Sequence, residues 1–153
     1  PEKREEVTTE GGLDVTHDPR SLERAMARMR AAGIRSSLFI DPDETMVRRS
    51  RELGADAIEL HTGSFAHHPD NPALVAALAH ASALGHALGL HVHAGHGLTV
   101  RNVTPVAAIP EIEELNIGHT IVSRSVFVGI AEAVREMRVA MNAARASLHG
   151  AHT

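Results

Sequence analysis

Four short apolar runs recur along the chain, separated by longer polar and amphipathic segments. The runs cover residues 36–40, 57–61, 90–94 and 115–118 and consist mostly of Leu, Ile, Val and Ala. Short apolar runs bounded by polar or glycine residues are typical of buried strands. We therefore predict four strands, and no turn between them has the composition of a β-hairpin.

Apolar residues at helical spacing fill the segments before and between these strands. They predict five helices, over residues 18–33, 43–53, 71–89, 102–109 and 124–148. Asp18 and Asn71 each precede a proline, a pairing typical of a helix start, and Asp41 with Glu44 has the spacing of a capping box. The last helix is expected to be continuous, with one apolar face formed by Phe127, Ile130, Val134, Met137, Met141 and Leu148.

The order of these elements is one helix followed by four βα units. Such alternation predicts an α/β fold with a parallel sheet and right-handed crossovers. Because a (βα)8 TIM barrel needs eight strands, the chain is either a small open sheet or half of a barrel. Its 153 residues predict a single domain over 1–153.

Composition removes several classes of function. A net charge of −4 gives no basic patch for nucleic acid, and 43% hydrophobic residues predict a globular protein. There are no cysteines, so cysteine-ligated metals and disulfides are excluded and a cytoplasmic location is expected. No apolar run reaches the length of about 20 residues that a membrane-spanning helix needs.

Polar residues gather where the predicted strands end, which is where parallel α/β proteins carry their chemistry. Glu59 and His61 lie in the second strand and at its end, and His93 and His96 flank the end of the third. A carboxylate inside an apolar strand is costly unless it is paired or functional, which makes Glu59 a candidate. His96 stands between two glycines, where an imidazole suits proton transfer and has little to pack against.

The segment Gly118-His119-Thr120 connects the last strand to the next helix. Backbone N–H groups at such a helix start bind anions, and barrels often hold phosphate in this region. The histidines on predicted loops, helices and the tail are expected to be solvated: His17, His67, His68, His80, His86, His149 and His152.

Two other functions remain open from the residues alone. His91, His93 and His96 are enough imidazoles for a metal-dependent hydrolase of the barrel type, although no Asp or Lys stands at a comparable strand end. A non-catalytic phosphate-binding half-barrel is the second. We expect no metal.

Six stretches in order resemble the pyridoxine 5′-phosphate synthase family of vitamin B6 biosynthesis. They are PEKREEVTTEGGLDV (1–15), SLFID (37–41), IELHTG (58–63), AGHGLTVRNV (94–103), IPEIEELNIGH (109–119) and IVSRSVFVGIAEAVREM (121–137). The resemblance implies a (βα)8 TIM barrel, of which this chain would be the second half, strands 5–8 with their helices. It further implies that the chain is truncated at its N-terminus and inactive alone.

The resemblance also implies roles for particular residues. His96 corresponds to the family's catalytic acid, and Glu59 to a carboxylate that stabilises a transition state. Thr8 corresponds to a contact with 1-deoxy-D-xylulose 5-phosphate. Gly97, Gly118 and His119 correspond to contacts with 3-amino-2-oxopropyl phosphate.

The family's reaction condenses these two small molecules and releases phosphate and water. It is implied to use acid–base chemistry without a cofactor, in a homo-octamer and with no nucleic acid or membrane partner. One departure concerns the strand end, where His93 stands in place of the family's usual asparagine.

Overall fold

A computed structural model describes residues 11–150, with side chains as far as residue 146, and contains eleven helices and strands within that range. Thr8 lies outside it. The strands are β1 (Ser37–Ile40), β2 (Ala57–His61), β3 (His91–Gly95) and β4 (Glu114–Asn116). They form one parallel sheet in the order β1-β2-β3-β4. The predicted α/β fold and its four strands are confirmed, with boundaries that differ by at most two residues.

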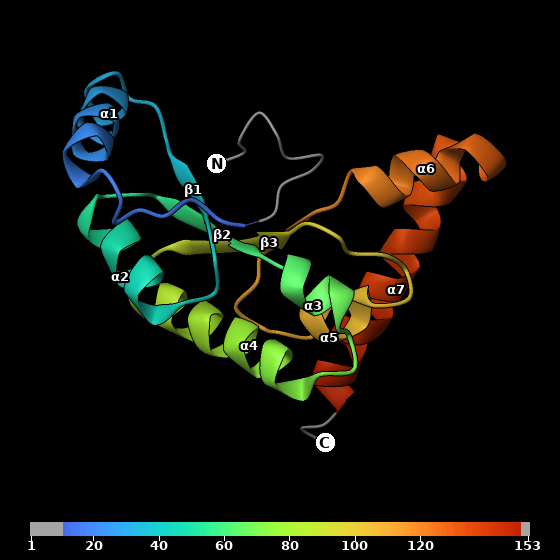
Figure 1. Cartoon of the computed structure of the whole chain (residues 1–153). Helices are drawn as coiled ribbons and strands as arrows, with labels where there is room; N and C mark the ends of the chain where they lie inside the picture. Colours follow the sequence, from blue (N-terminus) through green and yellow to red (C-terminus); the bar gives the residue numbers. More distant parts are fainter. Residues whose placement is uncertain (1–10, 151–153) are drawn as a thin grey trace.

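The helices lie between the strands in the chain. They are α1 (Pro19–Ala31), α2 (Glu44–Glu52), α3 (Gly63–His67), α4 (Pro72–Ala87), α5 (Val103–Ala107), α6 (His119–Val128) and α7 (Ile130–Gly150). Figure 1 shows α2, α4 and α5 along one side of the sheet, with α1 and α6 at its two margins. The short helix α3 follows β2 directly and was missed by the sequence pattern.

The two faces of the sheet differ in chemistry because successive side chains of a strand point to opposite faces. The face toward α2 and α4 is apolar and closed, and its central side chains are at most 6% exposed: Leu38, Ile40, Ile58, Leu60, Val92 and Ala94. Burying such aliphatic side chains is the main source of stability, at about 1.5–3 kcal/mol for each large one. The opposite face carries polar side chains, most of them half-buried or exposed.

Two predicted helix starts are confirmed and one is wrong. The Asp18 carboxylate accepts the Ser21 N–H at the start of α1, and the Asn71 side chain accepts the Ala73 N–H at the start of α4. Helix α2, however, is capped by Asp43, which accepts the N–H groups of two first-turn residues. Asp41 is not the cap, because its carboxylate is directed toward Gly12 and His61 instead.

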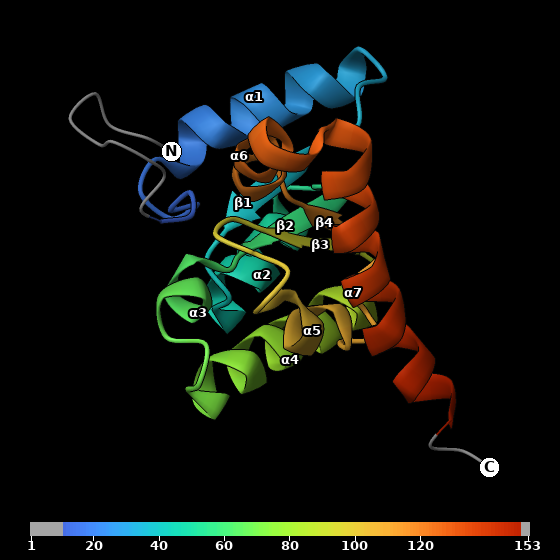
Figure 2. The ribbon, with the colours of Figure 1, turned by 90° about the vertical axis from the view of Figure 1, so that its right-hand side faces the viewer.

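The continuous helix predicted over 124–148 is also wrong. Gly129 has a φ of +83°, a left-handed conformation that ends α6, and α7 begins at the next residue. Figure 2 shows α6 folded back beside α7, and the Arg124 guanidinium joins them by two 2.9 Å hydrogen bonds to Glu136. The expected apolar face is therefore divided: Met137 is buried, whereas Phe127 is 82% exposed.

None of the helices in the described part of the chain combines the length and the apolar composition needed to cross a lipid bilayer.

Candidate active site

The register of the sheet places the polar residues in rows across it. Phe39, Glu59, His93 and Glu114 are consecutive partners from β1 to β4, and His61, Gly95 and Asn116 form the next row toward the carboxyl ends. Residues paired in this way lie side by side on one face of the sheet. The sheet therefore brings together three residues that are far apart in the chain. Glu59 on β2 lies beside His93 on β3 and within reach of Asn116 on β4.

Glu59 is half-buried and hydrogen-bonded across the sheet. Its Oε2 accepts a hydrogen bond of 2.7 Å from the Asn116 side-chain amide, which spans from β2 to β4. Burial raises the pKa of the Glu59 carboxyl above its usual value of 4.5, and the Asn116 hydrogen bond and nearby His93 oppose that rise. The structure thus holds a carboxyl group with raised proton affinity at the carboxyl end of the sheet.

Gly95 makes this contact across β3 possible. A Cβ atom at Gly95 would lie 2.6 Å from Glu59 Oε1 and 2.7 Å from the Asn116 carbonyl oxygen, both closer than real Cβ contacts. Any side chain would therefore displace the Glu59 carboxylate. The glycine before His96 is required by packing inside the sheet, a reason that the sequence pattern did not reveal.

His96 follows β3 and has an unusual backbone conformation. Its φ is +87°, and it is the one non-glycine residue with a positive φ in the described range. A left-handed conformation costs a non-glycine residue about 1–2 kcal/mol and persists only where the surroundings impose it. The His96 imidazole is half-buried and lies against the ring of His61.

His61 was noted at a strand end in the sequence but was assigned no role. Its side chain is 5% exposed, and its ring lies 5.1 Å from the His96 ring and 5.3 Å from the Phe39 ring, measured between centroids. His61 Nδ1 is 3.2 Å from Asp41 Oδ1, and Nε2 has no hydrogen-bond partner among the described residues. His61 is thus a buried neighbour of His96, held from its other side by Asp41.

Gly118 and His119 lie at the start of α6, which begins at His119 and not at residue 124 as predicted. Gly118 is the N-cap and supplies no capping side chain, so the first N–H groups of α6 have no side-chain acceptor there. The Thr120 hydroxyl donates to the Leu98 carbonyl at 2.8 Å, which fastens this helix start to the loop after β3. The structure therefore brings Gly97, Gly118 and His119 to the same end of the sheet as His96.

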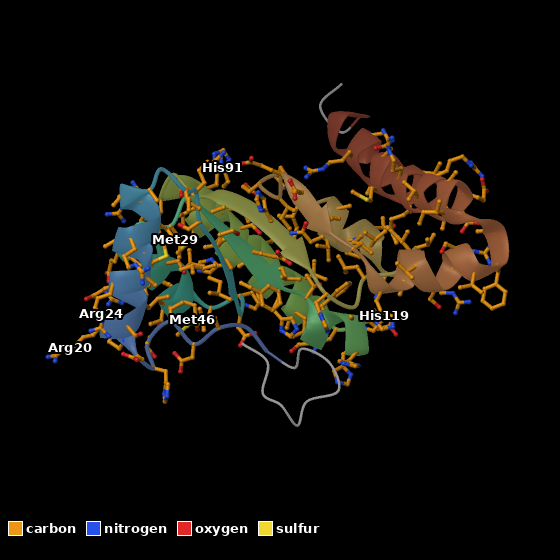
Figure 3. All side chains as sticks on the ribbon, turned by 90° about the horizontal axis from the view of Figure 1, so that it is seen from above. Arg20, Arg24, Met29, Met46, His91 and His119 are labelled. Carbon is orange, nitrogen blue, oxygen red and sulfur yellow. The ribbon has the colours of Figure 1, made fainter. Side chains whose placement is uncertain are left out.

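The histidines of the hydrolase alternative do not converge. His91 starts β3 and pairs with Glu113 at 2.8 Å, whereas His96 lies beyond the other end of that strand. Figure 3 shows His91 and His119 at opposite ends of the sheet. Within residues 11–150, no three His, Asp or Glu side chains gather where one metal ion could be held.

The other described histidines are solvated, as predicted: His17, His67, His68, His80 and His86 are all exposed. The side chains of His149 and His152 lie outside the described residues.

Comparison with known proteins identifies the family. Residues 1–143 match the family model described as pyridoxal phosphate biosynthesis protein PdxJ. The chain belongs to this family.

Relatives that carry the name pyridoxine 5′-phosphate synthase match nearly the whole of this chain. The protein of Zymomonas mobilis is 49% identical over 148 residues, which cover 95% of this chain and 58% of that protein. Those of Synechococcus sp. and Coxiella burnetii are 51% and 52% identical, covering 99% and 90% of this chain and 63% and 59% of theirs. The chain therefore spans about three-fifths of the length of these PdxJ relatives.

The packing at Gly95 predicts the effect of adding one methyl group. Gly95→Ala should lower the free energy of unfolding by about 1–3 kcal/mol, because the methyl displaces Glu59 and the β4 backbone. Urea unfolding followed by circular dichroism measures the change. Gly11→Ala is the control, since among the described residues its methyl group would meet only Asp41 Oδ2, at 3.8 Å. Equal stability of the two variants would contradict the packing argument.

The left-handed backbone at residue 96 predicts that glycine is more stable there than alanine, the reverse of the usual order. His96→Gly should be more stable than His96→Ala by about 1 kcal/mol, because glycine adopts a positive φ without steric cost. Both variants lose the imidazole, so their difference isolates the backbone. Matched urea titrations provide the measurement, and an alanine variant as stable as the glycine variant would show that the turn is unstrained.

The raised pKa of Glu59 predicts a pH-dependent effect of Glu59→Gln. A carboxyl with a higher pKa in the folded state binds more protons folded than unfolded, so its contribution to stability falls as pH rises above 4.5. Glutamine has no such dependence. The stability of Glu59→Gln relative to wild type should therefore increase with pH from 4.5 upward and then level off. Urea titrations at several pH values test this, and a difference that decreases with pH would contradict it.

Proposed function

We propose that this chain forms the carboxyl-terminal half of a pyridoxine 5′-phosphate synthase. In this proposal the four strands are strands 5–8 of a (βα)8 TIM barrel. The protein condenses 3-amino-2-oxopropyl phosphate with 1-deoxy-D-xylulose 5-phosphate, releasing phosphate and water. The observation that carries the proposal is the convergence of Glu59, His96 and the Gly118-His119 helix start at one end of the sheet, in a member of the PdxJ family.

The two margins of the sheet support a barrel that continues beyond the described strands. Within the described residues, β1 and β4 each pair with one neighbouring strand, and Leu13 N–H donates to the Phe39 carbonyl on the outer side of β1. A barrel adds strands at both margins. The family's octamer would follow from the complete barrel.

The chemistry of the site suits this condensation. Imine formation, loss of water and ring closure all move protons to and from atoms around a carbonyl carbon. His96 is proposed to donate a proton to a departing oxygen. Glu59 is proposed to face the positive charge that develops on nitrogen while the imine forms, and no cofactor is needed.

Phosphate binding is proposed for the loop after β3 and the start of α6. Gly97 and Gly118 have no side chains, so their backbones leave room for a phosphate beside the first N–H groups of α6. His119, exposed at the first turn, supplies a further donor. Thr8 is proposed to contact the second substrate, in keeping with the family pattern.

The test joins this chain to the first part of the Zymomonas mobilis synthase, which supplies the remaining strands. We expect the chain alone to be inactive and the joined protein to form pyridoxine 5′-phosphate from the two phosphorylated substrates. His96→Asn should lower kcat by about 10²–10⁴-fold through loss of the acid. His80→Asn, on the exposed surface of α4, is the control.

Two outcomes would overturn the proposal. A joined protein that folds and binds phosphate without forming product would favour the non-catalytic phosphate-binding alternative. An active protein in which His96→Asn matches wild type would remove His96 from the mechanism.

A further inference from the structure

The strained backbone of His96 requires support from elsewhere in the fold. Its φ of +87° belongs to the region that glycine prefers, and the neighbouring Gly97 has a φ of +74°. Two successive left-handed residues define a tight reversal, which we name the 95–97 turn. Such a conformation is retained at a histidine only if surrounding contacts fix it.

Thr62 makes the contacts that fix the backbone of this turn. Its side-chain oxygen lies 2.7 Å from the Gly95 carbonyl oxygen and 2.5 Å from the His96 carbonyl oxygen. Its backbone N–H also donates to the Gly95 carbonyl at 2.8 Å. Thr62 is fully buried, so water does not compete for these carbonyl groups. Thr62 therefore contacts the carbonyl groups of two successive residues, Gly95 and His96, through one hydroxyl group.

The neighbours of Thr62 in the chain also contact the 95–97 turn. The preceding residue, His61, places its ring against the His96 ring at an interplanar angle of 51°. The following helix α3 brings Ala66 under Gly97, where an added Cβ would lie 2.6 Å from the Ala66 Cβ. The end of β2, Thr62 and helix α3 therefore contact the 95–97 turn both at its backbone and at the His96 imidazole.

We propose that Thr62 is a positioning residue for His96. Its hydroxyl holds the left-handed backbone of the 95–97 turn, and this backbone sets the direction in which the imidazole leaves the chain. Thr62 acts through His96 and touches no substrate. The catalytic consequence rests on the function proposed above, whereas the structural consequence does not.

Two matched substitutions separate the hydroxyl from the shape of the side chain. Thr62→Val keeps the branched shape and the backbone N–H but removes the hydroxyl. Thr62→Ser keeps the hydroxyl and removes the methyl group. The first measurement is NMR on the 153-residue chain, with the His96 Cα and Cβ shifts and HN–Hα coupling reporting its φ.

We expect Thr62→Val to move these His96 and Gly97 signals away from left-handed values, and Thr62→Ser to leave them in place. The amide signals of β1 serve as the internal control for the fold. If the valine variant does not fold, Thr62→Ala removes the same hydroxyl and should shift the same signals. A left-handed His96 in a folded variant without the hydroxyl would overturn the proposal.

The second measurement uses the joined, active protein. Thr62→Val should lower kcat at least tenfold while KM for both substrates stays within twofold, because substrate contacts are intact and only the acid is misplaced. Thr62→Ser should retain kcat within threefold. An unchanged kcat in the valine variant would overturn the positioning role. If the joined wild type is inactive, the proposed function fails, while the NMR result still decides whether Thr62 holds the turn.

Discussion

The hydrogen bond between Glu59 and Asn116 is the interaction on which the arrangement of the site depends. It spans the strand between them, and it exists because that strand contributes Gly95 at the crossing point. One glycine therefore lets a side chain of β2 contact a side chain of β4. The same glycine is the first residue of the 95–97 turn, which carries His96. Gly95 therefore affects the positions of both the Glu59 carboxylate and the His96 imidazole.

The site contains features that cost stability, and the rest of the fold offsets them. A half-buried carboxyl with a raised pKa, a left-handed histidine and a buried imidazole nitrogen without a partner are each unfavourable. They lie within two adjacent strand ends, above a closed apolar face formed by the same strands. Successive side chains of β2 and β3 point to opposite faces of the sheet, so the same strands contribute apolar side chains to the core and polar side chains to the site.

The elements that depend on local pattern were predictable, and those that depend on distant contacts were not. The four strands follow from apolar runs, and the starts of α1 and α4 follow from Asp18 and Asn71 with the prolines after them. The choice of Asp43 over Asp41 as a cap was not readable, because it depends on Gly12 and His61 elsewhere in the fold. The break at Gly129 had a local signal, a glycine within the predicted helix, which the helical spacing on both sides concealed.

The candidate site divides in the same way. Glu59, His96, Gly118 and His119 could be proposed as site residues because strand ends can be predicted from sequence. Asn116 and Thr62 were not, since their partners are 57 and 34 residues away and are set by the register of the sheet. A period-two reading of β4 would have put Asn116 on the polar face, but only the register shows that it meets Glu59.

The chemistry of the polar face bears on whether the sheet belongs to an open fold or to a barrel. Parallel sheets in open α/β folds are covered by helices on both faces, so their strands are apolar throughout. Here the row Phe39, Glu59, His93 and Glu114 is largely polar and contains three ionisable side chains. A helix packed on this row would bury those charges at high cost. A barrel interior instead lets them contact one another and a bound polar substrate, which supports the barrel in the proposed function over an open sheet.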